Sequence, residues 1–151
     1  MSTPIEKLKA LSACSETCSF NIPLVYVKGK QLMTLNSSNR MQYHQRASIK
    51  DKFKKSIEPE IQKLSRFSSG HVHFIYQVYF SDKRSRDMDN MVYMIKWLQD
   101  SLVEAGLLDD DKHVSYTMLP PISEPKLEKH HCNVTTITLT GEDGYYEKVK
   151  K

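Results

Sequence analysis

Residues 71–80 carry the clearest alternation of apolar and polar side chains in the chain. In the sequence HVHFIYQVYF, every second position is apolar or aromatic, which places these side chains on one face of an extended strand. This face contains Val72, Phe74, Tyr76, Val78 and Phe80. The opposite face contains His71 and His73, which we interpret as surface residues rather than as metal ligands. The pattern therefore predicts a strand with one face in the core.

Residues 91–106 carry the clearest helical pattern. Apolar side chains recur three or four residues apart and form one stripe along a helix. The stripe contains Met91, Met94, Ile95, Leu98, Leu102 and Ala105. Asp89 or Asn90 can cap the start of this helix, and Gly106 can end it. Core packing accounts for the stripe without any cofactor.

A second helix is predicted over residues 41–64, where apolar side chains fall close to helical spacing. These side chains are Tyr43, Ala47, Phe53, Ile57 and Ile61. Pro59 should bend or divide the helix, because proline lacks the backbone N–H of a helical hydrogen bond. The polar face carries Lys50, Lys52, Lys54 and Lys55. Two interpretations of these lysines stay open, a solvated surface and a contact with phosphate.

The remaining pattern predicts a small α+β domain. Shorter strands are predicted at four further places, residues 18–27, 31–35, 115–119 and 132–140. Residues 120–126 are predicted to form a loop. Residues 71–119 form a β-α-β unit, with the right-handed crossover that such units adopt. We predict a mixed sheet within a domain over residues 18–143, preceded by an extension (1–17) and followed by a basic tail (144–151).

The composition suits one globular domain of 151 residues, with 39% apolar and 26% charged residues. The net charge of +4 permits binding to nucleic acid without requiring it. No apolar run approaches the ~18 residues of a membrane span. The N-terminus also lacks the apolar core of a secretory signal, so we expect a cytoplasmic protein with no membrane partner.

The cysteines give a weak indication of a metal site. Cys14, Cys18 and Cys132 are odd in number, which argues against a disulfide framework. Together with His130 and His131 they offer zinc ligands, but their C-x3-C spacing is not that of the usual zinc motifs. We favour the interpretation that the thiols bind no metal and that the histidines lie on the surface.

Two acidic clusters flank the predicted helix over residues 91–106. Asp87 and Asp89 precede it in the sequence SDKRSRDMDNM, and the run Asp109–Asp111 follows it. In an extended chain the first two aspartates face the same side, ~6–7 Å apart, where their charges repel unless a cation lies between them. Carboxylate oxygens are ligands that Mg²⁺ prefers. Taken singly, each cluster suits a helix cap or a solvated turn. Taken together in one β-α-β frame, they favour a metal site.

The basic run beside the first cluster suits a phosphodiester substrate. In an extended chain Lys83 shares a face with the two aspartates, while Arg84 and Arg86 point the other way. Such cations can hold phosphates on either side of a metal, and pairing with nearby acids is the structural alternative. Lys96, two helical turns after the second aspartate, lies on the same helix face. It also has the spacing of an ordinary ion pair with Asp100.

These motifs resemble the RusA family of Holliday junction resolvases, small endonucleases often encoded by phages or prophages. The resemblance rests on DKRSRDMDN, KWLQDSL, EAG and DDDKHV, over about residues 82–114. It implies a homodimer that binds branched DNA and nicks two symmetric strands of a four-way junction with Mg²⁺, or with Mn²⁺ in its place. Carried over by motif, the metal ligands are Asp87, Asp89 and Asp111, with Asp110 as a neighbour. The active-site lysine is Lys96.

One spacing departs from the family pattern. Lys96 lies three residues further from Asp89 than the family's lysine does, and a gapless alignment places Tyr93 at that position. The leading hypothesis is a Mg²⁺-dependent junction endonuclease of DNA recombination and repair. Its predicted DNA contacts are Lys83, Arg84, Arg86, Lys50 and Lys54. Two alternatives stay open, a branched-DNA-binding protein of the same fold without cleavage and a module that does not bind nucleic acid.

Overall fold

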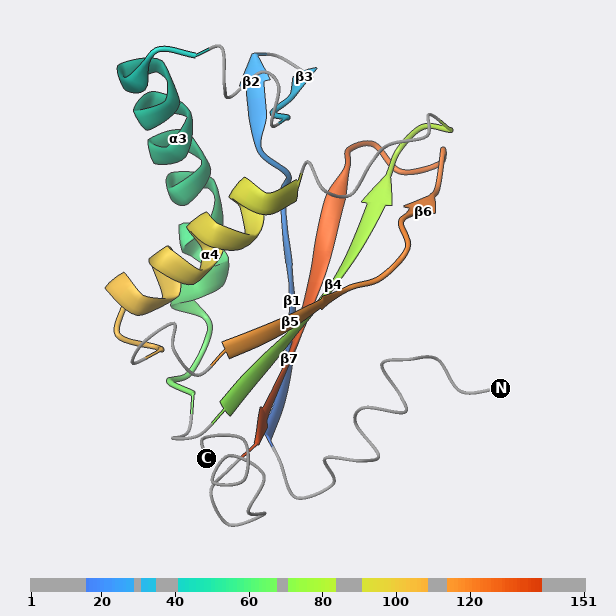
Figure 1. Cartoon of the computed structure of the whole chain (residues 1–151). Helices are drawn as coiled ribbons and strands as arrows, with labels where there is room; N and C mark the ends of the chain where they lie inside the picture. Colours follow the sequence, from blue (N-terminus) through green and yellow to red (C-terminus); the bar gives the residue numbers. More distant parts are fainter. Residues whose placement is uncertain are drawn as a thin grey trace.

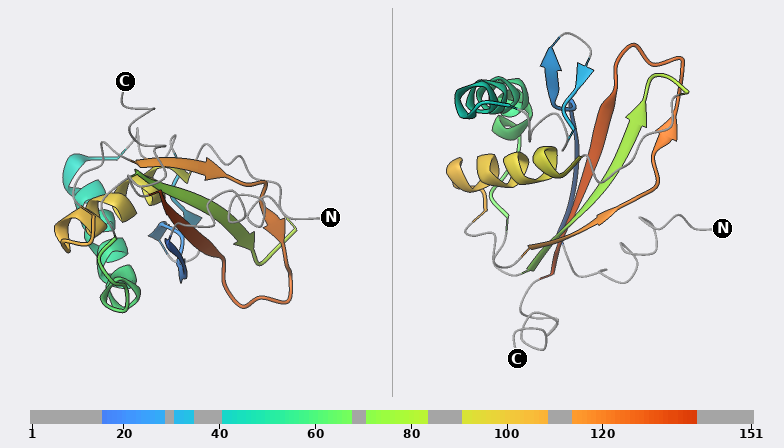
Figure 2. Two further views of the ribbon diagram at one scale, coloured as in Figure 1. Left: turned by 90° about the horizontal axis from the view of Figure 1, so that it is seen from below. Right: turned by 45° about the horizontal axis from the view of Figure 1, so that its top comes forward.

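The computed structural model describes residues 16–28, 31–34, 41–67, 71–83, 91–108 and 114–139. In this part of the chain, two helices lie on one side of a mixed β-sheet (Figures 1 and 2). The strands are β1 (Glu16–Ile22), β2 (Tyr26–Lys28), β3 (Gln31–Leu32), β4 (His71–Phe80), β5 (Val114–Met118), β6 (Ile122–Ser123) and β7 (His131–Leu139). The helices are α3 (Tyr43–Gln62) and α4 (Val92–Glu104). The predicted α+β class is confirmed.

The sheet is ordered around β4. The strand order is β1-β7-β4-β5, and β6 pairs with the last residues of β4. β7 is antiparallel to both β1 and β4, whereas β5 and β6 are parallel to β4. β4, α4 and β5 therefore form the β-α-β unit that was predicted for residues 71–119. β2 and β3 pair with each other in a separate two-stranded sheet.

The predicted core face of β4 is buried throughout. Its five apolar side chains are at most 2% exposed. They share one core cluster with Met94, Leu98 and Leu102 of α4 and with the buried side chains of α3. Burying an apolar side chain of this size contributes ~1.5–3 kcal/mol. The alternation in residues 71–80 therefore determines which face of the sheet the helices cover.

The single strand predicted over residues 18–27 is in fact two strands. β1 ends at Ile22, and β2 begins at Tyr26, beyond Pro23. β1 pairs with β7, whereas β2 pairs with β3, as predicted for the segment that contains residues 31 and 32. Proline has no N–H to donate to a sheet ladder, which accounts for the break.

α3 is one continuous helix that includes Pro59, so the predicted division of this helix is wrong. Pro59 is exposed, and the carbonyl group that loses its hydrogen bond can be solvated. The predicted stripe is wrong at its start, because Tyr43 is 83% exposed and Ala47 is also exposed. The buried row instead repeats every four residues, at Ile49, Phe53, Ile57 and Ile61.

Three smaller predictions are also corrected. Met91 occupies the N-cap position of α4 without a side-chain cap, where the sequence favoured a preceding polar residue. Ala105 is exposed, and the buried stripe of α4 includes Trp97 and Ser101 in its place. The predicted loop over residues 120–126 contains β6, because its backbone pairs with the end of β4.

Gly106 ends α4 as predicted. Its φ of +77° lies in the left-handed region, which turns the chain back on the helix. The N–H groups of Leu107 and Leu108 then both donate to the carbonyl oxygen of Leu102, at 3.0 and 3.3 Å. The buried Leu108 side chain is held against the core by this turn.

We expect Gly106→Ala to lower the free energy of unfolding by ~1 kcal/mol. Apart from Gly106 and its two neighbours in the chain, no atom of the described residues lies within 4 Å of a Cβ built on Gly106, so the cost is conformational and arises from a left-handed alanine. Gly106→Asn is the matched control, because asparagine tolerates this conformation better than alanine does. It should lower the free energy of unfolding by less. Urea unfolding measures both variants, and an alanine variant as stable as the asparagine variant contradicts the explanation.

Candidate functional site

The residues that carry the metal prediction lie outside the described part of the chain. Asp87, Asp89 and Asp111 belong to this group, together with Asp110 and the basic pair Arg84 and Arg86. Within the described ranges, no group of three or more His, Cys, Asp or Glu side chains is arranged to hold a metal ion. The magnesium site therefore stays a prediction, and the structure contributes the positions of the residues that flank it.

The flanking residues lie at the two ends of α4. Met91 lies between the first acidic cluster and the start of the helix, and Leu108 lies between the end of the helix and the second cluster. Both side chains are buried in the core cluster on the helix side of the sheet. Between them lies a helix of 13 residues, which is ~20 Å long. The two acidic segments therefore start from opposite ends of one helix.

The strand pairing places the far flank of the second acidic segment. A shared site requires the chain after Gly106 to return towards the carboxyl end of β4. Val114, the first described residue after this segment, pairs with Val72 at the amino end of β4. Lys83, the last described residue before the first segment, follows the carboxyl end of the same strand and is exposed. The described backbone therefore does not bring the second acidic segment to the carboxyl end of β4.

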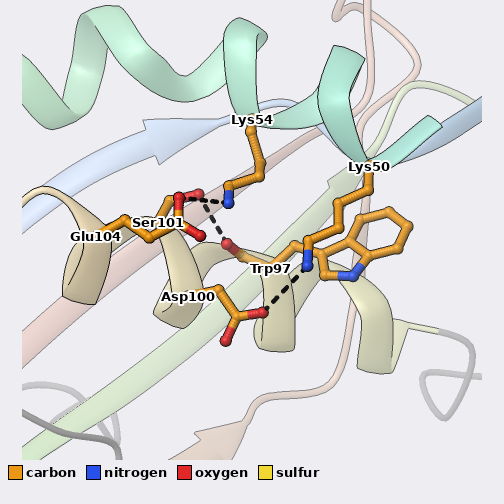
Figure 3. Close-up of polar contacts among 6 residues, drawn as sticks. All are labelled: Lys50, Lys54, Trp97, Asp100, Ser101 and Glu104. Carbon is orange, nitrogen blue, oxygen red and sulfur yellow. Dashed lines mark hydrogen bonds and ion pairs between the residues drawn. The ribbon is translucent and has the colours of Figure 1, made fainter. Parts of the chain in front are cut away.

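Two of the predicted phosphate-binding lysines form ion pairs between the helices (Figure 3). Lys50 Nζ lies 3.6 Å from Asp100 Oδ2, and Lys54 Nζ lies 2.5 Å from Glu104 Oε2. Because both lysines and both acids are spaced four residues apart, the two pairs join successive turns of α3 and α4. Among the described residues, Asp100 pairs with Lys50 and not with Lys96, so the predicted pair within α4 is not the one formed.

The two candidates for the family's lysine position differ in exposure. Lys96 is exposed on α4. Tyr93 is half-buried, and its ring centroid lies 5.2 Å from that of Trp97. Trp97 in turn contacts Phe53 of α3 at 6.2 Å between centroids. Tyr93 is therefore part of the packing between the helices, whereas Lys96 can approach a charged ligand from solvent.

His130 was predicted to be a surface histidine, but its side chain is only 10% exposed and has partners that the sequence did not reveal. Its Nδ1 accepts a hydrogen bond from the Ser81 backbone N–H at 2.9 Å, and its Nε2 lies 4.0 Å from Asp82 Oδ2. Because Nδ1 is the acceptor, the neutral ring carries its proton on Nε2. The ring also contacts Phe80 edge-on, at 5.5 Å between centroids. His130 thus holds Ser81 in place, directly after β4, where the chain leads towards the first acidic cluster.

The cysteines do not form a zinc site within the described residues. Cys18 pairs with Thr136 across the β1–β7 ladder, whereas Cys132 pairs with Ile22. The two thiols are thus four residue pairs apart along the strands, or ~13 Å. Burial also raises the pKa of the Cys132 thiol to about 12, which disfavours the thiolate that binds a metal. Cys14 lies outside the described residues.

The chain matches no protein-family model and no curated protein sequence. Neither of the two described helices is long and apolar enough to cross a membrane. Because no family model and no curated sequence matches, the function of the chain must be inferred from its motifs and from the contacts of its described residues.

The Lys54–Glu104 pair should contribute a coupling energy of ~0.2–1 kcal/mol to stability, and less at high salt. The measurement is a double-mutant cycle with Lys54→Ala and Glu104→Ala, followed by urea unfolding at two salt concentrations. Within the described residues, Lys52, also on α3, forms no ion pair with Glu104. In the cycle that combines Lys52→Ala with Glu104→Ala, the effects of the two substitutions on the free energy of unfolding should therefore be additive. Equal coupling in the two cycles contradicts a specific pair.

We expect His130→Gln to destabilise the start of the segment after β4 more than His130→Asn does. The carbonyl oxygen of asparagine can take the place of Nδ1 as acceptor for the Ser81 N–H, whereas the glutamine amide lies nearer the position of Nε2. A part-buried donor without its acceptor costs ~1–3 kcal/mol. Hydrogen exchange at the Ser81 amide measures the effect, and equal protection in both variants refutes the assignment.

Proposed function

We propose that the chain is a Mg²⁺-dependent, structure-selective endodeoxyribonuclease that resolves four-way DNA junctions. It acts as a homodimer in DNA recombination and repair, in the cytoplasm of a bacterium or of a phage-infected cell. The proposal is supported most by the two acidic motifs of the sequence, DMDN and DDD, which adjoin the helix of a parallel β-α-β unit. A shared site requires the chain between Leu108 and Val114 to bring the second motif back to the first. The resemblance to the RusA family supplies the substrate class.

The donor chemistry of the acidic motifs fits the metal. Asp87, Asp89 and Asp111 would hold Mg²⁺, because it binds hard oxygen ligands and uses few carboxylates beside water. Mn²⁺ accepts the same ligands and would substitute for it. The bound ion would supply a water of lowered pKa and would stabilise negative charge at the phosphate. One of the three carboxylates is the proposed acceptor of the proton that the attacking water loses.

The cations divide into two groups by their contacts. Lys83 is exposed at the end of β4, and together with Arg84 and Arg86 it is the proposed contact with phosphates beside the cut. Lys50 and Lys54 can meet a phosphate only by releasing the acids of α4 with which they pair. The proposal therefore gives these two lysines the smaller share of DNA binding.

Lys96 is the proposed stabiliser of the leaving oxygen. The three additional residues before it place it ~4–5 Å further along the helix than in the family pattern. Its exposure on α4 supports this role, and the packing of Tyr93 against Trp97 speaks against the tyrosine as a substitute. A homodimer with twofold symmetry would present two such sites to the two symmetric strands of a junction.

Binding to branched DNA without cleavage is the second candidate function, and the displaced lysine favours it. A binder needs the cations but not a lysine placed at the reacting phosphate. The three aspartates argue for the enzyme, because carboxylates beside phosphate weaken binding unless a cation separates them. The two functions therefore differ in whether acid residues are required.

The test is cleavage of a synthetic four-way junction and of a linear duplex, with and without Mg²⁺. We expect paired nicks in the junction only, and only with Mg²⁺. Asp89→Asn should lower the cleavage rate at least about a hundredfold, since the lost ligand weakens several kcal/mol of charge stabilisation. Asp51→Asn is the matched control, because Asp51 is an exposed aspartate on α3 that pairs with Lys55, and it should cleave normally.

Three further results test the proposal and its alternative. Full cleavage by Asp89→Asn contradicts the assignment of that residue as a metal ligand. Tight, salt-sensitive junction binding with no nicks in either Mg²⁺ or Mn²⁺ supports the second candidate instead. Elution from DNA resin at very low salt contradicts both.

A further inference from the structure

Two histidines of β4 meet two hydroxyl groups of β5 on the face of the sheet opposite the helices. His71 and His73 are two residues apart on one strand, so both side chains project from this face. In the parallel pairing of the strands, His73 lies opposite Ser115, and Ile75 lies opposite Thr117. All four polar side chains are half-buried, so the structure corrects the interpretation of His71 and His73 as simple surface residues.

The two imidazole rings converge on one oxygen atom. Ser115 Oγ lies 2.7 Å from His71 Nε2 and 2.5 Å from His73 Nδ1. The second ring nitrogen of His73, Nε2, lies 2.8 Å from Thr117 Oγ1. The nitrogens of two rings thus face each other across a single hydroxyl group.

Burial favours the neutral form of the His73 ring. It lowers the pKa of His73, and the positive charge that His71 can carry lowers it further. A neutral imidazole is the form that binds metal ions. A serine hydroxyl has one proton, so Ser115 can donate to only one of the two facing nitrogens. The cluster therefore presents two ring nitrogens that the strands hold on either side of one hydroxyl group.

We propose that His71 and His73 bind one divalent transition-metal ion of the Zn²⁺, Ni²⁺ or Cu²⁺ class. His71 Nε2 and His73 Nδ1 are the two protein ligands. Metal–nitrogen bonds of ~2.0–2.1 Å at tetrahedral angles place two such nitrogens ~3.3 Å apart. Both nitrogens lie within 2.7 Å of Ser115 Oγ, so the rings must turn towards each other as the hydroxyl group leaves. The ion displaces the Ser115 hydroxyl, which is a poor ligand when it is protonated.

Thr117 supports this arrangement from outside the ligand pair. When His73 Nδ1 binds the ion, its Nε2–H donates to Thr117 Oγ1, which fixes the tautomer and the ring orientation. Histidine ligands of metal ions are commonly oriented by such a hydrogen bond. Within the described part of the chain, no third His, Cys, Asp or Glu is grouped with the pair.

This site is independent of the acidic motifs and of the proposed nuclease activity. Imidazole suits zinc, nickel and copper, whereas magnesium prefers oxygen ligands. An excess of Mg²⁺ should therefore leave the binding of Ni²⁺ unchanged.

The test is a calorimetric titration of the full chain with Ni²⁺ in excess Mg²⁺. We expect one site whose apparent Kd rises at least about tenfold in His71→Ala and in His73→Ala, and also in Thr117→Val. Ser115→Ala should bind as well as the wild type. The control is His44→Ala, because His44 is an exposed histidine on α3, and it should bind normally. Unchanged affinity in both β4 variants, or an equal loss in His44→Ala, overturns the proposal.

A second measurement needs no substitution and therefore does not depend on the folding of a variant. Substoichiometric Cu²⁺ broadens amide NMR signals close to its binding site. In the wild-type chain we expect the broadening to centre on residues 71–73 and 115–117. Broadening centred on His130 and His131, or spread evenly over all histidines, overturns the proposal.

Discussion

The burial of one face of β4 is the constraint on which the rest of the structure depends. This strand forms nine residue pairs with β7 and five with β5, while its apolar face packs beneath the helices. A slip of one residue in either ladder would exchange the two faces of the strand and move Phe74 out of the core. The register is therefore held by burial as well as by hydrogen bonds. It also determines which polar residues meet on the other face and at the end of the strand.

The segments that could be predicted are those in which a local period coincides with burial. β4 and α4 were identified because their apolar residues repeat at two or at three to four residues, and each packs one face in the core. The strand over residues 132–140 was identified by its β-branched residues, which favour strands. Gly106 was identified because a left-handed turn at the end of a helix favours glycine. The errors fall where the period is weak. In α3 the apolar residues that repeat every four positions begin at Ile49, but the sequence pattern also includes Tyr43 and Ala47. Only the packing against the sheet determines which of these side chains are buried.

Contacts between distant segments could not be predicted from local spacing. Asp100 has a lysine four residues before it, yet its partner is Lys50, because α3 and α4 bring these faces together. The bond from the Ser81 N–H to His130 spans 49 residues, and the meeting of His73 with Ser115 spans 42. For the acidic motifs, the sequence predicts which ions the side chains can bind, because this chemistry depends on residue type and local spacing. Whether the two clusters converge depends on tertiary structure, and their flanks begin at opposite ends of α4.

The sheet separates the proposed histidine site from the residues that flank the acidic motifs. Met91 and Leu108, which flank the acidic segments, are both buried in the core cluster on the helix side. The imidazoles of His71 and His73 project from the opposite face. Because carboxylates select hard ions and imidazoles select borderline ones, ligand chemistry alone is enough to keep the two classes of ion apart. Both arrangements depend on the same register of β4, since it places the helix on one face and Ser115 beside the histidines on the other. A substitution that loosens β4 should therefore disturb both together, whereas a substitution in either ligand set should affect one alone.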